Sequence, residues 1–191
     1  MVVRDNRSTQ RTKEAIHHAL FSLMKKKPFQ SISVAEIIRE ANISRSTFYN
    51  HYNDIFDLVE KIEDELAHTI ASKLSTIHYK SYVEGEHPII TAMYGLMEEN
   101  AEAMLSLLGE NGDRHFHDKL SRIMAEYSVE TWLQYAGRPE IYPYVTSFMS
   151  GGIINLFVES HKGEIVPDAE VLGYIAGEFL AFSATLVEND K

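Results

Sequence analysis

Apolar residues recur along this chain at the three- and four-residue spacing of amphipathic helices. The first such stripe predicts a helix from about Thr9 to Lys26 that Pro28 ends. No stretch alternates over the length of a strand, and no internal repeat or low-complexity tract is present. The pattern therefore predicts an all-α fold of about nine helices. The first stripe consists of Ile16, Ala19, Leu20, Leu23 and Met24.

Local start and stop signals predict two short helices after Pro28. Ser33 and Glu36 have the spacing of a capping box that opens a helix to Ala41, and Asn42 suits a left-handed position after it. Ser44 is the expected cap of a third helix that runs to about Asn50. A long fourth helix starts at Asn53 or Asp54, and its apolar stripe is Ile55, Leu58, Val59, Ile62, Leu66, Ile70, Leu74 and Ile77.

The rest of the chain continues in the same helical pattern. Further helices are predicted over roughly 88–100, 102–108, 112–136, 141–161 and 168–187, separated by segments rich in glycine and proline. We therefore expect two domains, a head over residues 1–53 and a larger helical body over residues 54–191.

Two short helices joined by "ANIS" have the dimensions of a helix-turn-helix. The second helix of that motif enters the major groove with its N-terminal residues near the base edges. Phe48 is expected to anchor the helix in the core of the head. The side chains that we expect to face DNA are Ser33, Ser44, Arg45, Ser46, Thr47, Tyr49, Asn50 and His51.

The charge distribution agrees with a nucleic-acid partner although the net charge is −10. Residues 1–53 hold nine Lys and Arg against four acidic residues, whereas the remainder holds nine basic and 24 acidic residues. This asymmetry indicates a basic head that meets a polyanion and an acidic body with another role.

Residues 12–59 resemble the DNA-binding head of the TetR family of transcriptional regulators. The stretch "ISRSTFYNHYND" is similar to the family signature "vs.gtlY.hF..K..L". The resemblance implies a homodimer, about six further helices, and a two-helix dimerisation face near the C-terminus. The body, with "HPIITAMYGLMEEN" and "SFMSGGIINLFVESHKG", resembles the subgroup related to dihydroxyacetone-kinase regulators.

One position departs from the family pattern. Ile55 stands where relatives commonly carry a lysine before the leucine of the fourth helix, so a phosphate contact common among relatives is missing. Arg4, Arg7 or the run Lys25–Lys27 are candidates to replace it. We expect Arg4 and Arg7 to lie in an arm that orders only on DNA.

Methionine and aromatic residues gather in the central helices of the body. Such residues at helical spacing form a core, but their flexible or amphipathic side chains also suit an adaptable pocket for a small apolar or aromatic effector. The residues considered for this pocket are Met93, Tyr94, Met97, Phe116, Met124 and Tyr127.

Metal and cofactor sites are not expected. His115 and His117 are two residues apart, so one helix would point them in nearly opposite directions. A surface position is the favoured interpretation for both histidines, and His115 is also a candidate, with Tyr94 and Tyr127, for a hydrogen bond to the effector. The chain has no cysteine, no GxSxG, no HExxH and no phosphate-binding glycine loop, so an enzyme is an unfavoured alternative.

Glycines inside two late helices indicate close helix–helix approach, because glycine costs about 1 kcal/mol against alanine in a helix interior. Both helices also carry wide apolar stripes. We therefore predict a dimer interface that contains Phe148, Gly152, Ile153, Phe157, Ile175 and Phe179.

These observations together predict a TetR-type regulator. We expect a homodimeric, ligand-responsive repressor that binds a palindromic duplex operator in the cytoplasm, with no membrane partner. No signal sequence or membrane span is expected from the apolar pattern. A transcriptional activator and a regulator controlled by a partner protein remain alternatives.

Overall fold

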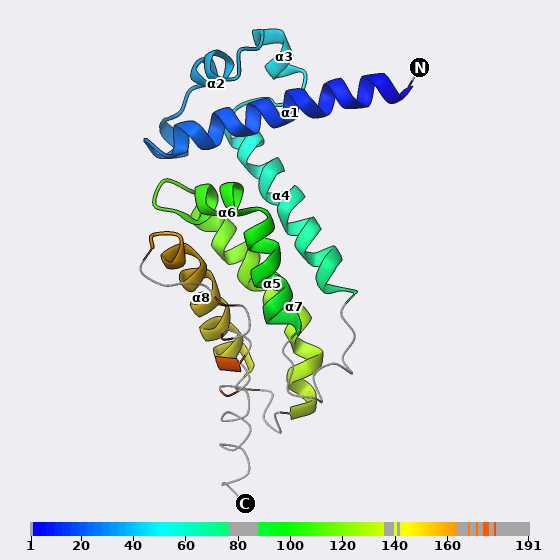
Figure 1. Ribbon diagram of the computed structural model, residues 1–191, viewed down its shortest axis with the longest axis vertical. Coiled ribbons are helices and arrows are strands. Elements are labelled where there is room, and N and C mark those ends of the chain that lie inside the picture. The colour runs from blue at the N-terminus through cyan, green and yellow to red at the C-terminus, as the bar shows by residue number, and fades with distance from the viewer. Residues whose placement is uncertain are drawn as a thin grey trace, which may run out of the picture. The chain divides into compact units, whose positions relative to one another are not determined.

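The computed structural model describes residues 2–76, 88–135, 140, 142–163, 168, 171, 174, 175 and 178. Its helices confirm the predicted all-α fold within these residues (Figure 1). No helix among them is long and apolar enough to cross a membrane. The elements are α1 (Val2–Met24), the 3-10 helix η1 (Phe29–Ser31), α2 (Val34–Glu40), α3 (Arg45–Tyr49), α4 (Ile55–Leu74), α5 (Pro88–Glu99), α6 (Ala101–Leu108), α7 (Arg114–Tyr135) and α8 (Tyr142–Ser160).

The chain divides into two compact units. Unit 1 comprises Met1–Leu66 together with Glu102–Arg114, and unit 2 comprises Ala67–Ala101 together with His115–Lys191. The unit that contains the helix-turn-helix therefore includes most of α6, which is distant in sequence. The predicted functional boundary between residues 53 and 54 stays a prediction.

The first helix begins earlier than the sequence predicted. It starts at Val2 rather than near Thr9, so Arg4 and Arg7 lie within α1 in the structure, and their ordering on DNA stays a prediction. No glycine or proline interrupts residues 2–24, and the Gln10 side chain donates to Glu14 one turn later at 3.1 Å. The predicted end is correct to within two residues.

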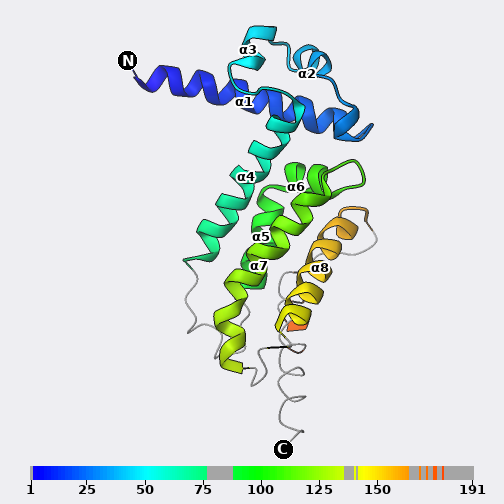
Figure 2. The same cartoon turned by 180° about the vertical axis from the view of Figure 1, so that it is seen from behind.

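The core of unit 1 lies between α1, α2, α3 and the first half of α4. Ile16, Leu20, Ile37, Phe48 and Leu58 are fully buried there, each stabilising the fold by about 1.5–3 kcal/mol relative to exposure. The helices α2 and α3 lie on the same side of α1 (Figures 1 and 2). In the basic N-terminal region, α2 and α3 therefore pack on an apolar core that they share with α1 and the first half of α4.

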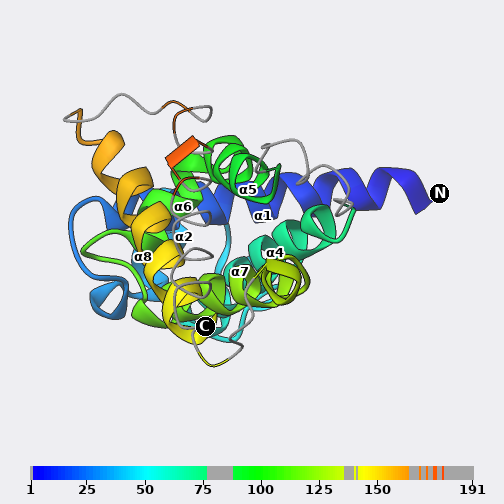
Figure 3. The same cartoon turned by 90° about the horizontal axis from the view of Figure 1, so that it is seen from below.

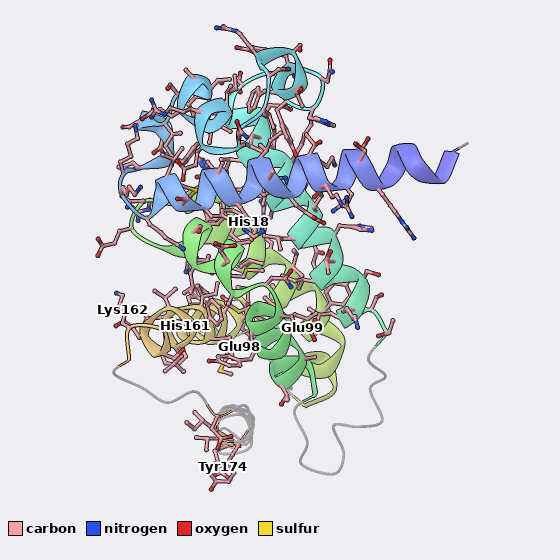
Figure 4. All side chains as sticks on the ribbon, turned by 45° about the horizontal axis from the view of Figure 1, so that its top comes forward. His18, Glu98, Glu99, His161, Lys162 and Tyr174 are labelled. Atoms are coloured by element: carbon pink, nitrogen blue, oxygen red, sulfur yellow. The ribbon has the colours of Figure 1, made fainter. Side chains whose placement is uncertain are left out.

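The segment after α6 is joined to the end of α1. The Asn111 side chain donates to the Met24 carbonyl at 2.8 Å, and the Asn111 carbonyl accepts from the Phe29 amide at 3.1 Å. His18, labelled in Figure 4, lies with Nδ1 2.8 Å from a Glu102 oxygen. These contacts place residues 102–114 in the same compact unit as the helix-turn-helix.

Unit 2 is built on α5, α7 and α8, with α5 and α8 packed side by side (Figures 1 and 3). The Phe157 ring on α8 is fully buried and meets the Tyr94 ring of α5 edge-on, at 5.9 Å between centroids. Most of the predicted helix over 168–187 lies outside the described residues. Ile77, the last residue of the predicted α4 stripe, also lies outside them.

Candidate nucleic-acid interface

Ser33 begins α2, and the predicted capping box is confirmed. Its hydroxyl oxygen accepts from the Glu36 amide at 3.3 Å, while Oε2 of Glu36 accepts from the Ser33 amide at 2.9 Å. Nζ of Lys27 lies 2.8 and 2.9 Å from the two oxygens of the same carboxylate. Hydrogen bonds from Lys27 and then Ser33 lower the pKa of Glu36 to about 2. Lys27 is therefore engaged within the protein.

The turn between α2 and α3 has the predicted left-handed residue. Asn42 has a φ of 51°, and the Ile43 amide donates to the Ile38 carbonyl at 3.2 Å across the end of α2. Asparagine tolerates this conformation better than most other residues. The turn sets the direction in which α3 leaves α2.

Ser44 caps α3 as predicted. Its Oγ accepts from the Thr47 amide at 3.0 Å, and it lies 2.8 Å from the Ser46 hydroxyl and 2.7 Å from the Thr47 hydroxyl. Three hydroxyl groups thus gather at the start of the helix. Hydroxyl groups can donate to or accept from either phosphates or base edges.

The structure separates the core face of α3 from its solvent face. Phe48 is fully buried, as predicted, whereas Tyr49 is 44% exposed although it is the next residue. The remaining predicted contacts lie on or beside the solvent face, and their contact with DNA stays a prediction. Ser33, Ser44, Arg45, Ser46 and Asn50 are exposed, and Thr47 and His51 are half-buried.

Arg45 and Tyr49 interact along the solvent face of α3. Nη2 of Arg45 lies 3.4 Å from the Tyr49 hydroxyl, and the guanidinium carbon is 5.5 Å from the ring centroid. A cation over a tyrosine ring is favourable. The pair restricts Arg45 before any partner binds.

The cations available for phosphate contact differ from those expected. Ile55 is 7% exposed and belongs to the core, so its position offers no cation. In the run after α1, Lys25 lies 3.7 Å from Glu102 and Lys27 is bound to Glu36. Among the described side chains of the head, exposed cations include Arg7, Arg11, Lys26, Arg39 and Arg45.

Sequence reasoning missed a hydrogen bond between α1 and the segment after α3. The Tyr52 hydroxyl lies 2.8 Å from Nε2 of His17, and Tyr52 is only 2% exposed. Burial lowers the pKa of His17 and raises the pKa of Tyr52. Nζ of Lys61 lies 5.4 Å from the Tyr52 ring centroid and donates to the His51 carbonyl at 3.1 Å. No pattern in a single sequence pairs residues 35 positions apart.

The residues considered for the effector pocket are in unit 2 and face its interior. Met93, Met97 and Phe116 are fully buried, Tyr94 and Met124 are nearly so, and Tyr127 is half-buried. The Tyr94 hydroxyl lies 3.3 Å from the Ser160 hydroxyl. His115 and His117 are exposed, so neither points into this interior. No group of His, Cys, Asp and Glu among the described residues could hold a metal.

A partly open cavity of about 440 Å³ lies elsewhere, in unit 1 between the end of α1 and α6. None of the predicted pocket residues lines it. Its lining residues are Met24, Lys25, Glu102, Leu105, Ser106, Gly109, Glu110 and Asn111.

A serine, a histidine and a glutamate come together at the end of α8, but their geometry does not suit nucleophilic catalysis. The Ser160 hydroxyl donates to the Phe157 carbonyl at 2.8 Å, and Nδ1 of His161 lies 3.0 Å from the same carbonyl. A carbonyl only accepts, so both groups direct hydrogens at it and His161 has no lone pair there to take a proton from Ser160. Nε2 of His161 lies 3.5 Å from Glu98 (Figure 4).

The predicted dimer residues fall into two groups. Phe148 is 66% exposed and Gly152 is also exposed, together with Tyr144 one turn earlier on α8 at 77%. Ile153 and Phe157, by contrast, are 5% and 0% exposed within one protomer, so they have almost no surface to offer a partner. Their side of α8 packs into unit 2, which argues against direct contact of these two side chains with a partner, and the interface stays a prediction.

Within the predicted helix over 168–187, the structure describes only one residue of the predicted interface. Ile175 is 53% exposed, and Phe179 lies outside the described residues.

The geometry of α2, the Asn42 turn and α3 defines a helix-turn-helix DNA-binding protein. Residues 16–62 match the sequence model of the family described as "Bacterial regulatory proteins, tetR family". This segment is therefore similar to the DNA-binding domain of the TetR family of transcriptional regulators.

Relatives with solved structures share the fold over nearly the whole chain. A TetR transcriptional regulator from Streptococcus agalactiae 2603V is 21% identical with a TM-score of 0.64, covering 98% of this chain and 99% of that one. The dihydroxyacetone kinase operon activator DhaS is 18% identical with a TM-score of 0.56, covering 92% and 97%.

A curated relative matches over a shorter region. The uncharacterized HTH-type transcriptional regulator YxbF of Bacillus subtilis (strain 168) is 24% identical over 109 residues. The match covers 53% of this chain but only 27% of the relative's own length.

Proposed function

We propose that the chain is a homodimeric, ligand-responsive repressor that binds a palindromic operator in the cytoplasm. The observation that carries this proposal is the division of α3, in which a fully buried Phe48 anchors a helix whose other side exposes Arg45, Ser46 and Tyr49. The excess of cations in residues 1–53 supports approach to DNA.

A palindromic operator follows from the proposed dimer. Two identical heads related by a two-fold axis read the same sequence on opposite strands, and their α3 helices would enter major grooves about 34–36 Å apart. The exposed row formed by Tyr144, Phe148 and Gly152 on α8 supports a dimer contact, because neighbouring apolar side chains are exposed at one-turn spacing.

Ligand control is proposed to act through α4. This helix starts in unit 1 and continues into unit 2, so one helix carries residues of both units. An effector that binds preferentially to one conformation of the body would shift the population of α4 orientations and thereby the spacing of the two heads. The buried methionines and rings of α5 and α7 support a neutral, mostly apolar effector.

Selection from random-sequence duplex DNA with the purified protein tests the DNA-binding part of the proposal. We expect a palindromic site whose half-sites are about one helical turn apart, and an affinity that falls steeply with salt. Failure to enrich any duplex would contradict the proposal, and enrichment of a single asymmetric half-site would contradict the proposed mode of assembly.

Thermal-shift screening with apolar and aromatic metabolites tests the effector. A bound effector should raise the melting temperature by an amount set by its concentration and affinity. The effector should also change the affinity for the operator, by the same factor by which the operator changes the affinity for the effector. If no compound shifts either quantity, control by a partner protein becomes the better interpretation.

An activator is the second candidate function. The similarity to DhaS, whose name describes an operon activator, supports it as far as a shared fold can. Transcription from a promoter that carries the selected site separates the candidates, because a repressor lowers the output and an activator raises it.

A further inference from the structure

The segment Asn50–Asp54 connects α3 to α4 and carries two of the side chains that we expect to face phosphate. Side chains of α1 and α4 hold this segment at three points. The Tyr52 hydroxyl meets His17 at 2.8 Å, the His51 carbonyl accepts from Lys61 at 3.1 Å, and the Asn53 amide donates to Asp57 at 2.7 Å.

Two of these points are linked by charge. Nζ of Lys61 also lies 2.9 Å from the Asp57 carboxylate, so one ammonium group joins the His51 carbonyl to the group that holds Asn53. Hydrogen bonds from the Asn53 amide and then from Lys61 lower the pKa of Asp57. The carboxylate therefore remains ionised at neutral pH and available to both donors.

The Tyr52 hydroxyl restricts the segment Asn50–Asp54 more than the Tyr52 ring would by itself. The ring packs against Phe48, at 5.8 Å between centroids, and is almost completely buried. A buried hydroxyl without a partner is costly, so the side chain is stable only where it meets His17. Because burial favours the neutral imidazole, Nε2 can accept from Tyr52 when the other ring nitrogen carries the hydrogen.

We propose that His17 and Lys61 are positioning residues for DNA binding, which act through Tyr52 and the His51 carbonyl to orient Asn50 and His51 toward the phosphate backbone. The proposal rests on the proposed function, because it requires that Asn50 and His51 face the duplex. Neither positioning residue needs to touch DNA.

The positioning role differs from simple support of the fold. Phe48 is fully buried, and Tyr52→Phe keeps the ring that packs against it, so we expect removal of one oxygen to leave the apolar anchor of α3 unchanged. The change instead frees the orientation of the segment after α3. The affinity of the folded protein should then fall about equally for all duplex sequences, because phosphate contacts carry no base information, whereas lowered stability alone does not change the affinity of molecules that remain folded.

The test uses the full chain and a duplex that the wild-type protein has selected from random-sequence DNA. Affinity is measured for the selected duplex and for single-base variants of it, at a temperature where circular dichroism shows every variant to be folded. The variants are Tyr52→Phe, His17→Leu, His17→Gln and the double variant with Tyr52→Phe and His17→Leu. Ser22→Ala is the control, since it removes a hydroxyl that joins α1 to Glu40 of α2 at 3.1 Å.

Tyr52→Phe and His17→Leu should each weaken binding about fivefold, the usual effect of one hydrogen bond, and should leave the base preference unchanged. The double variant should be no weaker than either single variant by more than about twofold, because both remove the same bond. His17→Gln keeps a polar group near the position of Nε2 and should restore most of the affinity. Ser22→Ala should bind like the wild type.

The proposal is overturned if Tyr52→Phe lowers the melting temperature but keeps the wild-type affinity. Should Tyr52→Phe fail to fold, equal affinities of His17→Leu and His17→Gln overturn it as well. If the wild-type protein selects no duplex, the proposed function fails together with this inference. Wild-type binding with unaffected variants contradicts only the positioning role.

Discussion

Lys27 and Glu36 form an ion pair in which the ammonium group lies 2.8 and 2.9 Å from the two carboxylate oxygens. The same carboxylate accepts the amide hydrogen of Ser33. One side chain thus fixes the start of α2 to the segment that follows α1. The lysine run after α1 is therefore not simply a solvated cluster of charges.

The Glu36 carboxylate should make the stability of unit 1 sensitive to acid. Its pKa in the folded protein is about 2, below the ordinary value of 4.5, so its contribution is present above pH 4.5 and is lost as the pH falls toward 2. In Glu36→Gln the melting temperature should fall less over that window. Thermal melts monitored by circular dichroism measure this, with Glu60→Gln on the exposed side of α4 as the control. Parallel curves for Glu36→Gln and the wild type would contradict the prediction.

His17 should produce a second loss of stability at milder pH. Burial lowers its pKa in the folded protein below 6.5, so the unfolded chain takes up a proton first as the pH falls. The contribution is therefore present above pH 6.5 and is lost as the pH falls through the folded pKa. Chemical unfolding between about pH 7.5 and pH 5 should show a shallower pH dependence for His17→Gln. Identical slopes would mean that His17 titrates alike in both states.

Arg45 and Tyr49 should have different effects on DNA binding. Tyr49→Ala should weaken binding about equally for all sequences, because a phosphate contact carries no base information. Arg45→Ala should cost about 1–3 kcal/mol and should also relax preference at one base pair of each half-site. Competition binding with single-base operator variants measures both effects. Unchanged affinity in the double variant of Thr47→Ala and Tyr49→Ala would exclude this face of α3 from the interface.

Phe148 and Phe157 should separate assembly from folding. Phe148→Glu places a charge on the exposed row of α8 and should convert the dimer into a folded monomer. Phe157→Ala removes a fully buried ring and should cost about 3–5 kcal/mol of stability. Light scattering and thermal melts distinguish these results. Phe56→Glu, at an exposed ring of unit 1, should leave the dimer intact. A Phe148→Glu protein that remains dimeric would place the interface elsewhere.

The features that sequence predicted best depend on nearby residues. The capping box at Ser33, the left-handed Asn42, the cap at Ser44 and the burial of Phe48 are all confirmed. Each is determined by residue types within a few positions, where backbone hydrogen bonds must be satisfied locally.

The features that the sequence did not indicate depend on information that local sequence lacks. A wide apolar stripe cannot show which side meets the body of the same protomer, so it predicts dimer contact for Ile153 and Phe157 without indicating that both side chains are buried inside unit 2. The bond between His17 and Tyr52 depends on the approach of two distant segments. The predicted start of α1 was too late, because the polar residues before Thr9 contain no helix breaker and fit either a helix or an unstructured arm.

The two hydrogen bonds of Asn111 limit how freely this regulator can be recombined. A chimera that takes only residues 1–66 as an exchangeable module would leave the Met24 carbonyl and the Phe29 amide without the partners that residue 111 supplies. It would also need the tight loop before residue 113, where a Cβ at Gly112 would overlap the Leu107 carbonyl oxygen. The DNA-binding unit that could be transferred to another protein is therefore discontinuous in sequence. Grafting it onto another ligand-binding body requires the short loop as well as the N-terminal segment.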